Sequence, residues 1–390
     1  MDARFFGMKR IRALVLVGLG GLFPVVGIAQ TVTPAQAEAL ERDGKLSEAA
    51  EAWRALTQQN PKDAGAFASL GIVLAKQQRY EEAIAAYKQA LSLDPKLLNI
   101  ELNLGLAEFK QGNFEAAIAP FRAALAAEPG NAQARTLLGL SYYGAKRFAE
   151  SADTLSIAAK ADPNNVELAG ILAQSCILAK KFSCAVDEAT KVLQLSPDSV
   201  SAHVLNAEAL DGLGRTPEAI AELQRALRLS PREPNLNFGL GYLYWRSHKY
   251  DEASSAFQAE LAVDPKNAQA IVYLGDIAMK KGDYAAAIPL LQQALQLKKD
   301  LRIGYMDLAN IYIEQKRDND AVEALRQAEK LDPEQSDAHY RLARLYRDMG
   351  NQAESQKEFE AVRKLQKKKQ EGTDLAMKMA GATASEDKQH

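Results

Sequence analysis

The chain has 390 residues, of which 47% are hydrophobic and 25% charged, a composition typical of a globular protein with several domains or one long array. Its formal net charge is −2, and acidic and basic residues are interspersed. This balance argues against a nucleic-acid partner and against a polybasic membrane contact.

The first thirty residues have the layout of a signal peptide. Basic residues precede an apolar run over residues 13–28 and a small-residue site that ends at Ala29. We expect cleavage there, so that a periplasmic or secreted protein begins at Gln30 and has no membrane span. The alternative is an inner-membrane anchor through residues 13–28, although this run contains Pro24 and is short for a bilayer core of about 30 Å. The absence of an Asn-x-Ser/Thr sequon fits a bacterial envelope protein.

One pattern then recurs every 34 residues between residues 30 and 366, which gives about ten units. Proline closes most units, and Lys299 takes its place in one of them. The prolines lie at positions 61, 95, 129, 163, 197, 231, 265 and 333. Because proline cannot continue a helix, each marks the end of a helical segment.

Two positions in every unit are restricted to Gly, Ala or Ser. The first begins at Ala37 and ends at Ala343, and the second, twelve residues later, begins at Ala49 and ends at Ser355. Small side chains let two antiparallel helices approach closely. A large apolar residue, such as Phe257, follows the second position by one helical turn in most units. Each unit is therefore predicted to be helix, turn, helix and stop.

These residues resemble the tetratricopeptide repeat, whose pattern of Leu-Gly, aromatic, Ala and Pro spans 34 residues. The resemblance implies an all-α fold, namely an α-solenoid in which about ten helix-turn-helix units stack into a right-handed superhelix. The first helices would line a concave groove, and the second helices would lie outside. A single hairpin cannot bury its apolar face, so its neighbour must cover it.

Four departures from the pattern concern geometry. Pro120 and Pro289 lie inside second helices, where we expect a slight kink. Asn206 replaces a leucine, and we expect a hydrogen-bonded core amide, with a role in specificity as the alternative. Gln36 also replaces a leucine and indicates a solvated cap on the first unit.

The sequence contains no recognisable catalytic or cofactor motif. The four histidines have no His, Cys or Glu partner at metal-ligand spacing, and no phosphate loop or nucleophile elbow follows residue 29. These histidines are His203, His248, His339 and His390. We therefore expect no enzyme activity, no metal, no cofactor and no small-molecule substrate.

The two cysteines, Cys176 and Cys184, flank the turn of the fifth unit. An even count in an exported chain favours a disulfide, provided that the Cα atoms lie within about 7 Å. The alternative is two independent small apolar side chains.

Beyond the last unit, residues 367–390 begin with three lysines and continue as a small, polar, aperiodic stretch. We expect a basic extension of the last helix, since lysines favour the negative end of the helix dipole. A disordered tail is expected to follow.

The family resemblance predicts which side chains face the groove. No three successive units carry the Lys, Asn and Arg set with which some members of the family clamp a C-terminal carboxylate. The corresponding positions hold apolar residues, which suit an amphipathic helix or an extended hydrophobic segment. They are Leu102, Leu106, Phe109, Leu140, Tyr143, Phe238, Tyr242 and Trp245.

Two functions are compatible with this sequence. The first is a non-catalytic protein-protein interaction scaffold of the bacterial cell envelope, with Phe238, Tyr242 and Trp245 as anchors for a protein or peptide partner. In the competing interpretation these rings pack between adjacent first helices, Trp245 most of all. The second function is a structural assembly component, a rigid spacer arm of an envelope export, pilus or outer-membrane complex.

Overall fold

The computed structural model describes residues 32–97 and 99–386, with side chains up to residue 374, and in this part the chain forms twenty helices and no strand. The helices are α1 (Pro34–Arg42), α2 (Leu46–Gln59), α3 (Ala64–Lys76), α4 (Tyr80–Leu93), α5 (Ile100–Lys110), α6 (Phe114–Ala127), α7 (Ala132–Gly144), α8 (Phe148–Ala161), α9 (Val166–Leu178), α10 (Phe182–Leu195), α11 (Val200–Gly212), α12 (Thr216–Leu229), α13 (Leu236–Arg246), α14 (Tyr250–Val263), α15 (Ala268–Lys280), α16 (Tyr284–Leu297), α17 (Arg302–Glu314), α18 (Asp318–Leu331), α19 (Ser336–Asp348) and α20 (Gln352–Glu386). The predicted signal peptide, residues 1–29, lies outside the described residues. None of the helices that are described is both long enough and apolar enough to cross a membrane.

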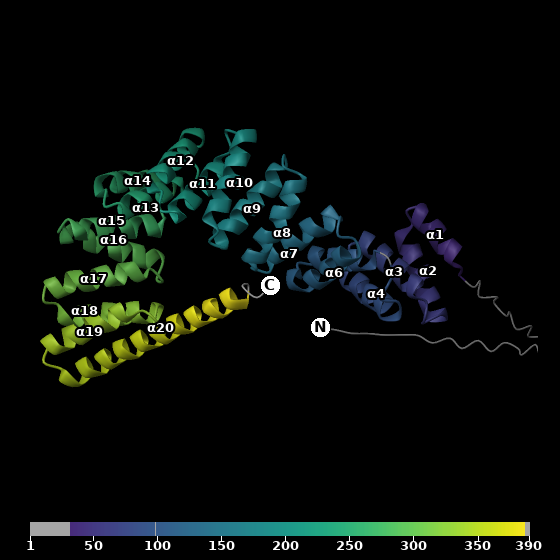
Figure 1. The fold of residues 1–390 in the computed structure, drawn as a ribbon. Helices are drawn as coiled ribbons and strands as arrows, with labels where there is room; N and C mark the ends of the chain where they lie inside the picture. The colour runs from purple at the N-terminus through teal and green to yellow at the C-terminus, as the bar shows by residue number, and fades with distance from the viewer. Residues whose placement is uncertain (1–31, 98, 387–390) are drawn as a thin grey trace, which may run out of the picture. The chain divides into compact units, whose positions relative to one another are not determined.

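The chain divides into two compact units, residues 1–120 and residues 121–390. Within each unit, odd-numbered first helices pair with the even-numbered second helices that follow them, and each pair packs on the next (Figure 1). The prediction of an all-α solenoid built from stacked hairpins is confirmed.

The small positions lie where the two helices of a hairpin touch. A Cβ atom added to Gly71 would lie 2.5 Å from the ring of Tyr87, and one added to Gly241 would lie 2.8 Å from the ring of Phe257. Both rings are almost completely buried. The recurring small residue therefore makes room for the recurring large residue of the partner helix.

Every hairpin turn uses the left-handed backbone conformation at one position. Five of the ten residues are glycines, and the other five carry side chains. They are Gly44, Gln78, Gly112, Lys146, Lys180, Gly214, His248, Gly282, Lys316 and Gly350. Because this left-handed residue recurs every 34 residues, it is a feature shared by all the hairpin turns. His248 occupies this position in its turn.

The departures from the repeat are resolved in different ways. Gln36 is exposed and accepts a hydrogen bond from the Thr33 amide, as expected of a solvated cap. Both α6 and α16 continue through their internal prolines. Asn206 is buried as expected, but its Oδ1 lacks a hydrogen-bond partner among the described residues, so the hydrogen bonding expected of this amide is not met at that atom.

The last helix is longer than its predecessors. The sequence predicted a basic extension and then a disordered tail over residues 367–390, whereas α20 continues to Glu386. Residues 370–386 contain four alanines, two methionines, two glutamates and no proline, although they also contain two glycines. Alanine, methionine and glutamate have high helix propensity, and without a proline nothing in this stretch forces the helix to end.

Candidate functional site

Helix α13 is held in place by a buried carboxylate from its own hairpin. Its N-cap residue, Asn235, has φ of 69° and offers no side-chain cap to the helix. Glu260 of α14 instead accepts hydrogen bonds from the Asn235 amide at 2.8 Å and from the Phe238 amide at 3.1 Å. Glu260 is fully buried, so the start of α13 is fixed to α14.

Three predicted anchors on α13 meet a tyrosine of the next first helix. We define the aromatic wall as Phe238, Tyr242 and Trp245 of α13 together with Tyr273 of α15. The ring of Tyr273 has its centroid 6.0 Å from Phe238, 5.7 Å from Tyr242 and 4.9 Å from Trp245. All four residues are half-buried. The wall therefore packs between two first helices and also keeps part of its surface exposed.

The three predicted anchors differ in the contacts that their side chains make within the protein. The ring of Phe238 lies 5.7 Å from that of Phe257, in the core of its own hairpin. Trp245 donates its Nε1 proton to Asp276 of α15. The ring of Tyr242 contacts those of Trp245 and Tyr273.

Two buried carboxyl groups lie beside the wall, and we call them the acid pair. Asp276 accepts hydrogen bonds from Trp245 and from Lys280 and is 1% exposed. Asp307 of α17 is 5% exposed, and its Oδ2 has no hydrogen-bond partner among the described residues. Burial, followed by the charge of Asp276, raises the pKa of Asp307 to about 8. Burial and the neighbouring charge therefore both favour the neutral form of Asp307.

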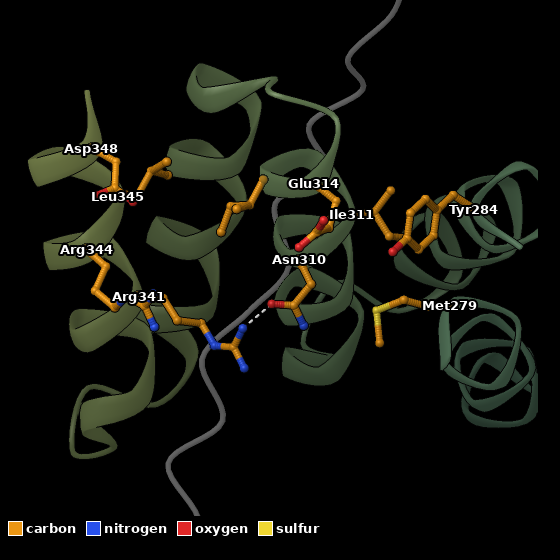
Figure 2. Close-up of a pocket in the computed structure, with 10 residues that line it drawn as sticks. Met279, Tyr284, Asn310, Ile311, Glu314, Arg341, Arg344, Leu345 and Asp348 are labelled. Carbon is orange, nitrogen blue, oxygen red and sulfur yellow. Dashed lines mark hydrogen bonds between the residues drawn. The ribbon is translucent and has the colours of Figure 1, made fainter. Parts of the chain in front are cut away.

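A pocket of about 460 Å³ is lined by the first helices α15, α17 and α19 and by Tyr284 of α16 (Figure 2). Met279, Asn310 and Glu314 line it from α15 and α17, and Arg341 and Arg344 line it from α19. Arg341 reaches across and donates a hydrogen bond to Asn310 (Figure 2). The pocket thus combines apolar surface with charges of both signs.

The other predicted groove residues are half-buried on their own helices. Leu102, Leu106 and Phe109 lie on α5 in the first unit, where Phe109 packs edge-on against Phe114 at 5.3 Å. Leu140 and Tyr143 lie on α7 in the second unit, where Tyr143 packs edge-on against Phe148 at 5.7 Å. Phe109 and Tyr143 thus have ring neighbours within their own hairpins, and the role of all five residues in binding stays a prediction.

Sequence reasoning missed Tyr273, the acid pair and Lys280. A signal was present, because Tyr273, Asp307 and Arg341 occupy one position of three successive repeats. That position is small or apolar in most earlier repeats. A run of polar side chains in it marks the stretch from α15 to α19.

Two histidines have carboxylate partners that sequence spacing did not reveal. The Nδ1 atom of His203 lies 2.6 Å from Glu222, and that of His339 lies 2.6 Å from Glu358. Each partner lies on the second helix of the same hairpin, 19 residues away. The expectation that the histidines lack a Glu partner was therefore too narrow, since it considered only spacings within one helix.

Cys176 and Cys184 are joined by a disulfide across the turn between α9 and α10, with their Cα atoms 5.9 Å apart. Cys176 is fully buried. The separation lies within the range that a disulfide can bridge. Formation of the bond during export stays a prediction for thiol labelling.

Comparison with known proteins identifies the repeat. Family models described as tetratricopeptide repeat or TPR repeat match residues 73–112, 102–166, 212–247, 238–301, 278–328, 309–350 and 336–369. No curated protein matches the sequence.

Several solved structures are similar to this chain. The crystal structure of the APC/C hetero-tetramer Cut9-Hcn1 is 16% identical, with 85% of this chain and 79% of that chain covered and a TM-score of 0.49. The C-terminal part of a TPR repeat-containing protein from Cytophaga hutchinsonii is 18% identical over 62% of this chain and 98% of that chain, with a TM-score of 0.48. YrrB, described as a TPR protein with an unusual peptide-binding site, is 20% identical over 47% of this chain and 94% of that chain, with a TM-score of 0.38.

The family models together span more than half of the chain, within the region of the 34-residue hairpins. The chain therefore belongs to the tetratricopeptide repeat family, whose members serve as protein-protein interaction scaffolds.

Proposed function

We propose that this protein is a non-catalytic scaffold of the bacterial cell envelope that holds an apolar helix or extended segment of a partner protein against the aromatic wall. Family membership supports the scaffold role, and the basic and apolar pattern of residues 1–29 supports export. The observation that carries the proposal is the half-buried aromatic surface on α13 and α15, together with the pocket on α15, α17 and α19.

The wall has the chemistry of an interaction hot spot. Aromatic side chains in the centre of a contact commonly contribute 2 kcal/mol or more each, because they bury a large area at low entropic cost. Here, ring-on-ring packing also fixes their orientation before a partner arrives. A preorganised surface loses less conformational entropy on binding.

The three anchors are expected to respond differently to truncation. Tyr242 contacts other rings of the wall, so Tyr242→Ala should remove binding surface at little cost to the fold. Trp245 bonds to a carboxylate that is 1% exposed, so Trp245→Ala should destabilise the hairpins as well. Phe238 packs on the hairpin core, so the loss of stability in Phe238→Ala should lie between those of Tyr242→Ala and Trp245→Ala.

Paired measurements of capture and stability test the proposal. We expect Tyr242→Ala to weaken capture of the native partner at least about tenfold while the melting temperature stays within about 3 °C of the parent. Leu229→Ala is the matched control, because Leu229 is a 40% exposed apolar residue on a second helix, α12. The proposal fails if Tyr242→Ala and Leu229→Ala capture the partner equally well, or if Tyr242→Ala lowers stability and leaves capture by the folded fraction unchanged.

A further inference from the structure

A cluster of metal-ligating side chains lies at the C-terminal end of the array, remote in sequence from the aromatic wall. It contains Glu329 of α18, His339 of α19 and Glu358 of α20, the last three helices of the second unit (Figure 1). One ligand atom from each residue lies within 4.8 Å of the others. We propose that these three residues form a binding site for a divalent transition metal, best suited to Zn²⁺.

The donor set fits this class of ion. One imidazole nitrogen and two carboxylate oxygens are common zinc ligands, and a water molecule can fill a fourth position. In a tetrahedral site with bonds of about 2.0–2.2 Å, neighbouring ligand atoms lie about 3.4 Å apart. On metal binding, the 2.6 Å contact between His339 Nδ1 and Glu358 must therefore lengthen, and the wider separations, up to 4.8 Å, must shorten. The side chain of Glu329 is 24% exposed, so it can make this adjustment once it gives up its contact with Arg326.

The charges of the cluster also favour an added cation. The side chains of Glu358 and His339 are 3% and 11% exposed. Arg326 donates to Glu329 and to Glu358 at 2.7 Å each, and its guanidinium is the cation that the two carboxylates share. Glu354 lies 3.7 Å from the same guanidinium. Glu354 also has the Lys357 ammonium at 3.6 Å, whereas Glu329 and Glu358 share the one guanidinium, so a divalent ion would balance the charge that remains on these two carboxylates.

The repeat register shows that Glu329 is the unusual member. Its position holds Leu or Ala in the second to eighth repeats. Those residues are Leu91, Leu125, Ala159, Leu193, Leu227, Leu261 and Leu295. A carboxylate in a position that otherwise packs against the next hairpin requires a partner there, and His339 Nε2 lies 3.8 Å from Glu329 Oε1.

The chain contains a natural half-site for comparison. Four repeats earlier, His203 pairs with Glu222 at the same 2.6 Å, and Arg225 donates to Glu222. The residue equivalent to Glu329 is Leu193, and His203 Nε2 faces the carbonyl of Pro197 at 3.1 Å. With only two of the three ligands, this half-site should not hold the metal.

Zinc titration of the tag-free chain from Gln30 onward tests the proposal by calorimetry. We expect one Zn²⁺ per chain with a Kd of about 10 μM or tighter, and a melting temperature that rises with Zn²⁺. Glu329→Leu should weaken binding at least about tenfold and retain the fold, because leucine is the residue of other repeats at this position. His339→Gln should weaken binding likewise.

The half-site provides the control, and Arg326 provides an independent check. His203→Gln should bind Zn²⁺ as the parent does. Arg326→Gln should bind Zn²⁺ more tightly, because it removes the competing cation. The proposal is overturned if the parent binds no Zn²⁺ below about 100 μM, if Glu329→Leu binds as the parent does, or if His203→Gln loses as much affinity as His339→Gln.

Discussion

Alanine substitutions of Gly239 and Gly241, both in α13, allow the effect of close packing on stability to be measured separately from the effect of helix propensity. A Cβ atom on Gly241 would lie 2.8 Å from two ring carbons of Phe257, whereas one on Gly239 would meet only Leu223, at 3.4 Å. Phe257 cannot yield easily, because it is fully buried and stacks on Tyr273 with ring centroids 5.4 Å apart. Alanine should therefore be tolerated at position 239 and resisted at position 241.

The magnitudes follow from two opposing effects. Replacing glycine by alanine within a helix stabilises it by about 1 kcal/mol at either position. Overpacking a filled core costs about 1–3 kcal/mol, and only Gly241→Ala incurs this cost. Gly239→Ala should raise the free energy of unfolding by about 0.5–1 kcal/mol. The difference between the two variants isolates the packing cost, since the propensity gain is common to both.

Thermal unfolding and hydrogen exchange together measure this difference. Gly241→Ala should melt at least about 2 °C below Gly239→Ala, and amide exchange should accelerate in α13 and α14. Local exchange is needed because a long repeat array need not unfold in one cooperative step. Equal melting temperatures and equal exchange in the two variants would refute the claim that the small position is a close helix contact.

Three further predictions concern export, the disulfide and Asp307. Intact mass of natively expressed protein should correspond to a chain that begins at Gln30, and a mass that includes residues 1–29 would contradict export with cleavage. Thiol labelling of unreduced, denatured protein should find no free thiol, and replacing Cys176 and Cys184 by serine should cost about 2 kcal/mol; two labelled thiols would contradict the bond. Because the folded pKa of Asp307 is raised to about 8, the folded state holds a proton that the unfolded state has lost, so stability should fall as pH rises from about 4 to about 8. Asp307→Asn should remove this pH dependence of the free energy of unfolding, which can reach about 1.4 kcal/mol per pH unit. If the denaturation midpoints of parent and variant change with pH in the same way, this prediction is contradicted.

The repeat and its close contacts were predictable because they depend on local rules repeated ten times. A small residue such as Gly241, a large residue such as Phe257 and a terminal proline recur at fixed offsets, and one hairpin explains them all. The turn conformation was not predicted, because only half of its residues are glycines and Lys146 or Lys180 gives no sign of a left-handed backbone.

The site was only partly predictable, because its polar contacts join different helices. The i, i+4 and i+7 spacing of Phe238, Tyr242 and Trp245 placed them on one face of a helix. Nothing in that helix indicates that Trp245 donates to Asp276, which lies 31 residues later. The Glu358 partner of His339 lies on another helix too, so these pairs emerge only once the hairpins are stacked.

Site-specific photocrosslinking in native cells tests the central claim most directly, namely that the aromatic wall contacts a partner protein. A photoreactive phenylalanine analogue would replace Tyr242 on α13 and, in a separate control, the exposed Leu229 on α12. The scaffold proposal predicts that one dominant protein is crosslinked from position 242 and not from position 229, and that Phe238→Ala reduces its yield. No adduct at position 242, or the same adducts at both positions, would contradict the assignment of the wall as the binding surface.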